Sequence, residues 1–302
     1  MVIVCYQCVK LVLTIVNIVV NAKIIIVCIL LPFFGFCQTL KDDKTYAPDS
    51  KTEYYLNLYS RTDLSQPSSH QKFIALISAL EAKKNTFRND EDFLHYVFKK
   101  VHQKILKNYT AYCSFNALAK DGTYNCLTAI AAYALLLDHF NVDFKIIETN
   151  YHIFIIVNSS ARQILFESTD PLAGFVSSPI EINKRINTYK QNLRHGNCNN
   201  RNYYRYSFDL YHEVNLDQLA GLMYYTLAVD AYNNKAFDAS INYLDKTIKF
   251  YQSVRVEEFS KVLQLMIAES NFNRDTNDIC LKKIQALRKK MPAFASISRQ
   301  GN

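Results

Sequence analysis

The sequence predicts an α+β protein in which helices pack on an antiparallel sheet and a second helical region follows. Apolar residues recur at helical spacing between residues 73 and 109, and again from about residue 216. Between residues 142 and 168 the pattern changes to the period of two that is typical of strands. Helices that lead into short strands joined by turns form an α+β domain.

Composition limits the classes of function. The chain has 302 residues with 49% hydrophobic content, which is enough for a large core, and its length favours about two domains. The net charge is +8, but the basic residues are scattered and form no arginine-rich run. We therefore expect no nucleic-acid partner.

Residues 1–37 are predicted to be a signal peptide or an N-terminal membrane segment. They contain no acidic residue, and Lys23 precedes an apolar run that ends near Cys37. This order is typical of a secretory signal, and a natural start near residue 21 would explain the apolar stretch ahead of Lys23. An uncleaved membrane anchor is the alternative. We expect an exported protein, periplasmic, secreted or membrane-anchored, that contacts the membrane only through this segment if it stays uncleaved.

A polar linker, residues 38–70, is predicted to lead into the helices. This segment is rich in turn-forming residues. Amphipathic spacing predicts helices in residues 73–84 and 89–109. Residues 126–140 are apolar almost all the way round, which predicts a central helix that other elements enclose.

Three strands are predicted next, in residues 142–149, 151–157 and 163–168. The middle strand alternates between two sets of residues, which we expect on opposite faces of the sheet: His152, Phe154 and Ile156, and Ile153, Ile155 and Val157.

The register of the last hairpin decides which side chain faces His152. If the turn lies between Val157 and residues 163–164, paired residue numbers sum to 321 or 322. A sum of 322 places Asp170 directly across from His152 on one face of the sheet, and we adopt this pairing. A slip of one residue would separate the two side chains.

Cysteine usage leaves room for a functional thiol. After the leader the cysteines are few and widely spread: Cys113, Cys126, Cys198 and Cys280. They are too few for a disulfide scaffold. Cys113 lacks a local partner, so we expect it to pack in the core. Residues 195–198 offer one histidine and one cysteine, which is a poor zinc signal, and we expect no metal site.

Cys126, at the start of the predicted central helix, is either a small core residue or a nucleophile. A cysteine beside an apolar helix is more often core packing. A thiol attacks a carbonyl best as a thiolate, which the positive end of a helix and an imidazolium both favour. The imidazole needs a carboxylate or amide on its other ring nitrogen, and His152 with Asp170 supplies that arrangement.

The order of a cysteine at a helix start, a histidine on a following strand and an aspartate on the next resembles the transglutaminase-like branch of the papain-like superfamily. The segments YNCLTAIAAYALLLDHFNVDFKIIETNYHIFIIV and ILFESTDPLAGF are similar to bacterial members, and the resemblance covers about residues 75–180. It implies that Cys126 is the nucleophile, His152 the general base and acid, and Asp170 the residue that orients the histidine. It also implies a peptide or protein substrate and no cofactor.

One position departs from the pattern of this superfamily. Papain-type enzymes carry a glutamine about six residues before the cysteine as an oxyanion donor, and this chain has Lys120 there. We therefore expect the oxyanion to be bound by the backbone N–H of Cys126 and a second donor, Tyr124 or Asn125.

Residues 216–302 are predicted to form helical hairpins that resemble tetratricopeptide repeats, which some bacterial members of the family carry behind the core. Residues 222–251 contain the bulky and small residues of such a repeat: Tyr224, Leu227, Ala228, Ala231, Phe237, Ser240, Leu244 and Thr247. A second, degenerate pair is expected in residues 257–271 and 278–290. Two pairs are few for a free-standing solenoid, so we expect them to dock on the core or to bind a protein partner.

Two functions remain open for a predicted domain of residues 71–215 and its helical tail. The first is an exported thiol enzyme that cleaves or transfers an amide through a thioester at Cys126. The second is a non-catalytic module whose pocket or tail binds a peptide or a protein. A reactive Cys126 thiol that depends on His152 would distinguish the enzyme from the module.

Overall fold

The computed structural model describes residues 49–62, 70–160, 162–192, 210–270 and 274–291, which belong to one compact unit that begins at Tyr46. The predicted leader, residues 1–37, lies outside these residues. Among the residues described, no helix is long and apolar enough to cross a membrane.

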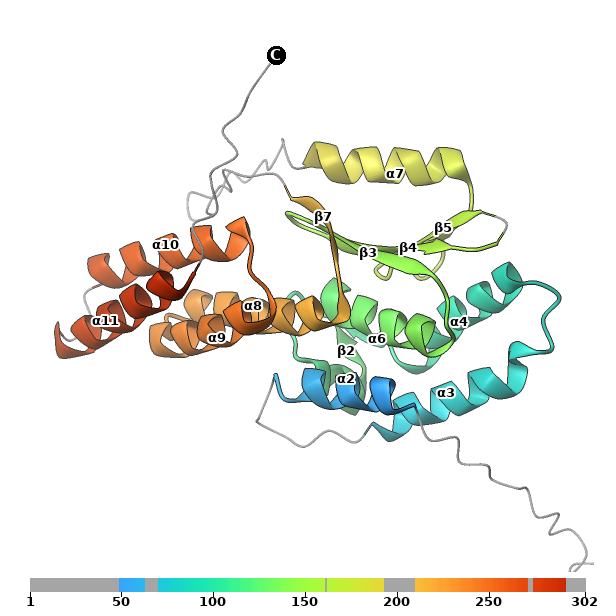
Figure 1. The fold of residues 1–302 in the computed structure, drawn as a ribbon, viewed down its shortest axis with the longest axis horizontal. Helices are drawn as coiled ribbons and strands as arrows, with labels where there is room; N and C mark the ends of the chain where they lie inside the picture. Colours follow the sequence, from blue (N-terminus) through green and yellow to red (C-terminus); the bar gives the residue numbers. More distant parts are fainter. Residues whose placement is uncertain (1–48, 63–69, 161, 193–209, 271–273, 292–302) are drawn as a thin grey trace, which may run out of the picture. The chain divides into compact units, whose positions relative to one another are not determined.

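A five-stranded antiparallel sheet forms the middle layer, with the strand order β6, β5, β4, β3, β7 (Figure 1). The strands are β3 (Phe144–Thr149), β4 (Ile153–Asn158), β5 (Gln163–Phe166), β6 (Phe175–Val176) and β7 (Tyr211–Val214). Three of them, β3, β4 and β5, match the strands that the period-two pattern predicts. The combination of helices with an antiparallel sheet confirms the predicted α+β class.

Helices cover both faces of the sheet (Figure 1). Helix α6 (Cys126–His139) lies against one face, and α7 (Pro179–Asn192) lies against the other. The side chains of β4 alternate between the two layers as the sequence predicts. Those on the α7 side are Phe154 and Ile156, and those on the α6 side are Ile153, Ile155 and Val157. Because both layers are covered, β4 is buried on its two faces.

Two helices before the sheet correspond to the amphipathic segments of the sequence, although the second ends at Lys104, and residues 108–109 of the predicted helix lie in a strand. The two helices are α3 (Gln71–Lys84) and α4 (Asp90–Lys104), and the short helix α5 (Phe115–Asp121) follows them. Helix α6 is the enclosed central helix that the sequence predicts, because every residue from Ala129 to Leu136 has no exposed surface.

Helix α2 (Ser50–Ser60) lies inside the segment predicted to be a linker. The Asp49 side chain accepts a hydrogen bond from the backbone N–H of Thr52 (2.6 Å) and so caps its first turn. Tyr59 is fully buried, and its hydroxyl donates to the carbonyl of Leu216 (2.9 Å). This part of the segment is therefore a packed helix, held by contacts far away in the sequence.

In the described part of the chain after the sheet, four helices lie in the region predicted to be helical: α8 (Leu216–Asn233), α9 (Phe237–Phe250), α10 (Val254–Glu269) and α11 (Arg274–Lys290). Helices α8 and α9 approach closely at Ala228 and Ser240, where the Ser240 hydroxyl donates to the Ala228 carbonyl (2.8 Å). Both residues are fully buried. Helix α8 also contacts α6 and α2, so this tail docks on the core.

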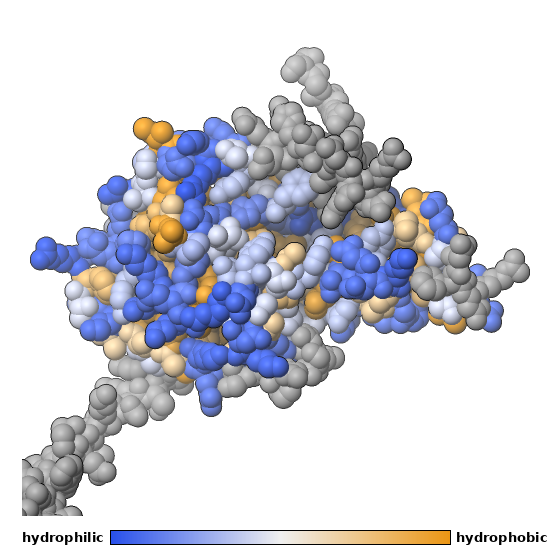
Figure 2. Space-filling model, turned by 180° about the vertical axis from the view of Figure 1, so that it is seen from behind, coloured by the Kyte–Doolittle hydropathy of each residue, from blue (hydrophilic) through white to orange (hydrophobic). Residues whose placement is uncertain are grey.

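The face turned away from the viewer in Figure 1 is largely polar (Figure 2). The apolar side chains visible there lie in small groups between charged ones. Scattered apolar residues of this kind are ordinary on a protein surface.

Candidate active site

Cys126 is the first residue of α6, and a capping box fixes the start of this helix. The Asn125 side chain accepts a hydrogen bond from the backbone N–H of Thr128 (2.9 Å), and the Thr128 hydroxyl accepts one from the backbone N–H of Asn125 (3.1 Å). The Cys126 thiol is free and half-buried. Since the first N–H groups of a helix have no acceptor within the helix, the positive end of α6 lies at this residue.

His152 lies in the turn between β3 and β4, where Thr149 holds its backbone. The N–H of His152 donates to the Thr149 hydroxyl (3.0 Å), and the N–H of Thr149 donates to the His152 carbonyl (2.8 Å). The imidazole packs against the ring of Tyr189 on α7, with 4.9 Å between the centroids. Its Nε2 forms a hydrogen bond of 2.5 Å with Oε2 of Glu167.

The structure brings Cys126 and His152 together. Burial disfavours the charged imidazole, but interactions with Cys126 and the hydrogen bond to the Glu167 carboxylate more than offset burial and raise the pKa of His152 to about 9. Because Glu167 occupies Nε2, an interaction of the imidazole with Cys126 falls to Nδ1. At neutral pH His152 is therefore an imidazolium that lies between Cys126 and a carboxylate.

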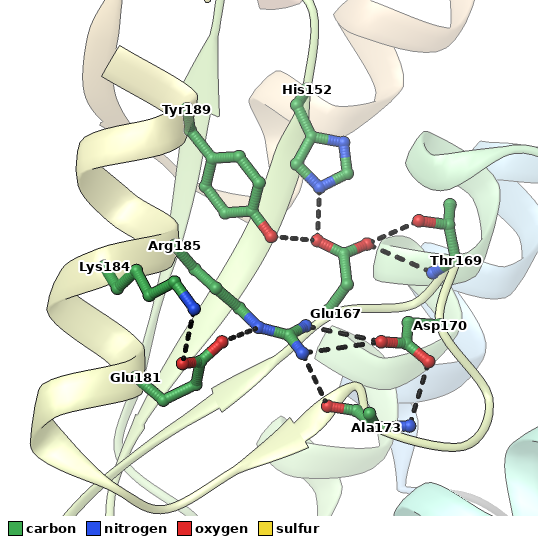
Figure 3. A network of polar contacts seen from close by, with 9 residues as sticks. All are labelled: His152, Glu167, Thr169, Asp170, Ala173, Glu181, Lys184, Arg185 and Tyr189. Carbon is green, nitrogen blue, oxygen red and sulfur yellow. Dashed lines mark hydrogen bonds and ion pairs between the residues drawn. The ribbon is translucent and has the colours of Figure 1, made fainter. Parts of the chain in front are cut away.

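Glu167 follows β5 directly, and every acceptor position of its carboxylate is used (Figure 3). Oε2 accepts from Nε2 of His152 and from the hydroxyl of Tyr189 (2.7 Å). Oε1 accepts from the N–H (3.1 Å) and the hydroxyl (2.7 Å) of Thr169. Burial acts to raise the pKa of Glu167, but His152, Thr169 and Tyr189 together lower it to about 2. Glu167 is thus the ionised carboxylate that orients His152.

Asp170, predicted for that role, lies elsewhere. Its carboxylate accepts a hydrogen bond from the backbone N–H of Ala173 (2.9 Å) and lies 3.5 Å from the guanidinium of Arg185 (Figure 3). Glu167 occupies the position on Nε2 of His152 that we expected Asp170 to take. This is a correction to the predicted site.

The hairpin register explains the exchange. Paired residues of β4 and β5 sum to 321, as for Ile155 with Phe166, and not to the adopted 322. Continued to His152, this register reaches Thr169, and the strand has already ended at Phe166. Glu167 is two residues before Thr169, so both side chains extend from the face of the sheet that carries His152. Glu167 therefore reaches His152 as its diagonal neighbour. The alternation of the strand was the signal that could have identified it.

The two expected oxyanion donors are both buried beside the start of α6. The side-chain oxygen of Asn125 caps the helix, and its side-chain NH₂ donates to the carbonyl of Ala111 (3.4 Å). Both ends of the side-chain amide therefore already have hydrogen-bond partners. The Tyr124 ring is buried and meets the ring of Tyr109 edge-on, with 5.7 Å between the centroids. Lys120 lies in the last turn of α5 with an exposed side chain. The first N–H groups of α6 are then the better oxyanion donors.

Tyr109 is a site residue that the sequence did not indicate. It lies in β1 (Asn108–Tyr109), which pairs in parallel with β2 (Thr123–Tyr124), the strand directly before Asn125. Its side chain is among the exposed large hydrophobic residues. Partial burial and the electrostatic effect of Cys126 raise the pKa of Tyr109, so its hydroxyl is protonated at neutral pH. The pairing of β1 with β2 brings Tyr109 to the start of α6, and no local sequence pattern predicts that pairing.

The remaining candidates lie outside this constellation or outside the described residues. Cys113 is half-buried, with its sulfur 3.6 Å from the Thr128 hydroxyl, and burial raises the pKa of its thiol. Residues 195–198, the weak zinc candidate, are not among the described residues. Within the part of the chain that the structure describes, no group of three or more His, Cys, Asp or Glu residues could hold a metal ion.

A thiol, an imidazolium and a carboxylate in this order can attack a carbonyl carbon and form a thioester. No family model, curated protein or solved structure matches this chain. The chemistry of the site therefore has to follow from the contacts of Cys126, His152 and Glu167.

Proposed function

We propose that this chain is a thiol enzyme that cleaves or transfers an amide or peptide bond through a thioester at Cys126. The observation that carries the proposal is the hydrogen bond of 2.5 Å between Nε2 of His152 and the buried Glu167, which leaves Nδ1 for Cys126. A structural cysteine needs no charged histidine beside it, nor a carboxylate that holds this histidine.

In the proposed reaction the Cys126 thiolate attacks the carbonyl carbon of the substrate. The backbone N–H groups at the start of α6 stabilise the oxyanion, and Nδ1 of His152 gives its proton to the leaving amine as the C–N bond breaks. The now neutral His152 takes a proton from water or from an acceptor amine, which attacks the thioester. Departure of the Cys126 sulfur restores the thiolate and the imidazolium, and Glu167 stays ionised throughout.

The transglutaminase-like family, export through residues 1–37 and a protein partner at the helices α8–α11 belong to this proposal as well. The order of the cysteine, histidine and carboxylate along the chain supports the family, although a glutamate replaces the expected aspartate. The docked helical hairpins are compatible with tetratricopeptide-like repeats.

Acyl transfer from an activated ester tests the proposal without knowledge of the natural substrate. We expect p-nitrophenyl acetate to acylate Cys126, seen by mass spectrometry of the intact protein and its peptides. The His152→Ala variant should react slower by on the order of a hundredfold. Cys280→Ala, which removes a buried thiol on α11, is the matched control and should react normally. Equal acylation rates for His152→Ala and the unmodified chain would overturn the proposal.

A further inference from the structure

Helix α7 covers the sheet beside the site with one apolar stripe. Ile182, Ile186 and Tyr189 recur at four and three residues, which places them on one face of the helix. They pack against a small cluster of strand residues that includes Phe154. The stripe therefore attaches α7 to the sheet at the end where His152 lies.

Tyr189 contacts both polar members of the site at once. Its hydroxyl donates to Oε2 of Glu167 (2.7 Å), the oxygen that also accepts from His152. Its ring packs against the His152 imidazole (Figure 3), with 4.9 Å between the centroids, and lies 5.1 Å from the ring of Phe154. Burial and the charge of Glu167 raise the pKa of Tyr189, so its hydroxyl stays a donor over the whole working range of pH.

Packing alone does not require this hydroxyl. A phenylalanine would supply the same ring to the apolar stripe, whereas only the hydroxyl reaches the carboxylate. With Thr169 on Oε1 and with His152 and Tyr189 on Oε2, Glu167 has four donors and cannot rotate away from the imidazole without losing them.

Arg185, one turn before Tyr189, holds the segment that follows Glu167. Its guanidinium donates to the Ala173 carbonyl (3.1 Å) and lies 3.5 Å from the Asp170 carboxylate. Residues four apart share a side of a helix, so Arg185 and Tyr189 extend toward the same loop. Helix α7 thus holds the Glu167 side chain, through Tyr189, and the loop that follows it, through Arg185.

We propose that Tyr189 is a positioning residue for the reaction at Cys126, whose hydroxyl fixes the Glu167 carboxylate against Nε2 of His152. This inference rests on the proposed function. It assigns to α7 a share in setting the charge of His152 and hence the reactivity of the thiol.

The test compares Tyr189→Phe with Tyr243→Phe, a tyrosine of α9 outside the site. Carbon-13 NMR of the Glu167 carboxyl, assigned with Glu167→Gln, follows its titration. Loss of one hydrogen bond to a charged group should move the Glu167 midpoint upward by about one to two pH units in Tyr189→Phe. The pH at which the rate of Cys126 alkylation by iodoacetamide falls on the acid side of its pH profile (the acid limb) should also move upward. Tyr243→Phe should change neither.

The outcomes separate this inference from the proposed function. If the unmodified Cys126 reacts like a free cysteine, the proposed function fails, whatever Glu167 does. If Cys126 is reactive but Tyr189→Phe leaves the Glu167 midpoint and the acid limb unchanged, only the inference fails. If Tyr189→Phe does not fold, the proton NMR resonance of the Tyr189 hydroxyl, recorded in the unmodified protein and in Glu167→Gln, tests the inference instead. A slowly exchanging proton resonance that vanishes in Glu167→Gln supports the inference, and its absence from the unmodified protein overturns it.

Discussion

Glu167 reaches His152 because its side chain is one methylene longer than that of an aspartate. The residue directly across from His152 in the extended register is Thr169, and a diagonal neighbour lies farther away than a direct one. The longer glutamate spans this diagonal, and Thr169 then supports the carboxylate through its N–H and hydroxyl. A direct neighbour and a diagonal one therefore share the task of orienting the histidine.

Exchanging each candidate carboxylate for its amide distinguishes Glu167 from Asp170. We expect Glu167→Gln to slow acylation of Cys126 by on the order of a hundredfold, because the neutral amide no longer stabilises the imidazolium. Asp170→Asn is the matched control and should remain within about threefold, because its partners are Arg185 and Ala173. Burst kinetics with p-nitrophenyl acetate measure both. A larger loss of acylation rate in Asp170→Asn than in Glu167→Gln would show that Asp170, and not Glu167, orients His152.

Two of the three central residues were placed from the sequence, and the third was missed. Cys126 is the first residue of an apolar helix and His152 directly precedes an alternating strand, so local patterns locate both. The third depended on a register that differs by one residue from the adopted one. A slip of one residue turns every side chain to the other face, so an error that is small along the chain changes which residue meets the histidine.

The loop after β5 is closed by its own backbone at Gly174. The N–H of Glu167 donates to the Gly174 carbonyl, and the N–H of Gly174 donates to the Asp170 carbonyl, each at 2.8 Å. A Cβ at Gly174 would lie 2.2 Å from the Glu167 carbonyl oxygen and 2.3 Å from that of Asp170. Because these are backbone atoms, the loop has no room for a side chain there.

We therefore expect Gly174→Ala to destabilise the protein by about 1–3 kcal/mol, as overpacking does. The backbone movement needed to make room for the alanine side chain should also displace Glu167 and reduce acylation of Cys126. Leu172→Ala, in the same turn and 97% exposed, is the control and should change neither quantity. Urea unfolding and the acylation rate provide the measurements. A Gly174→Ala variant as stable as Leu172→Ala would contradict this account of the loop.

The long, strongly patterned elements were predictable, and the elements defined by distant contacts were not. Helices α3, α4 and α6 and strands β3, β4 and β5 follow from apolar spacing. Helix α2 was predicted to be part of a linker because the contact that holds it is not local. The hydroxyl of its buried Tyr59 donates a hydrogen bond to the carbonyl of Leu216, far along the chain. The paired strands β1 and β2 are two residues each, too short for any period.

At the scale of the whole molecule, a buried polar cluster joins the sheet to the C-terminal helices. Glu148 of β3 lies 2.9 Å from the guanidinium of Arg255 on α10 and accepts a hydrogen bond of 2.5 Å from the Tyr251 hydroxyl. His212 of β7 lies 3.2 Å from the same carboxylate. Burial acts to raise the pKa of Glu148, but Arg255 and the other partners lower it, so the cluster contains an ionised carboxylate.

Removing the Arg255 charge should loosen this junction. Arg255→Gln leaves the Glu148 carboxylate without its cation in a buried position, and we expect a loss of about 3–5 kcal/mol in the free energy of unfolding. Lys261→Gln is the matched control on the same helix. It breaks only two more exposed ion pairs, with Glu257 and with Glu258, and should cost about 1 kcal/mol or less. Chemical denaturation of both variants checks the difference, and equal losses would contradict a structural role for the cluster.

The pH dependence of Cys126 alkylation tests the central claim, that Cys126, His152 and Glu167 act as one unit. With the pKa of His152 raised to about 9 and that of Glu167 lowered to about 2, the imidazolium and the carboxylate are both charged from about pH 4 to 8. At pH 6 an ordinary thiol, with a pKa of about 8.5, is almost entirely protonated. We therefore predict that iodoacetamide modifies Cys126 at pH 6 at least about tenfold faster than a free cysteine, and that His152→Ala abolishes this advantage. A rate that rises with pH as for a free cysteine, and is the same in His152→Ala, would contradict the account.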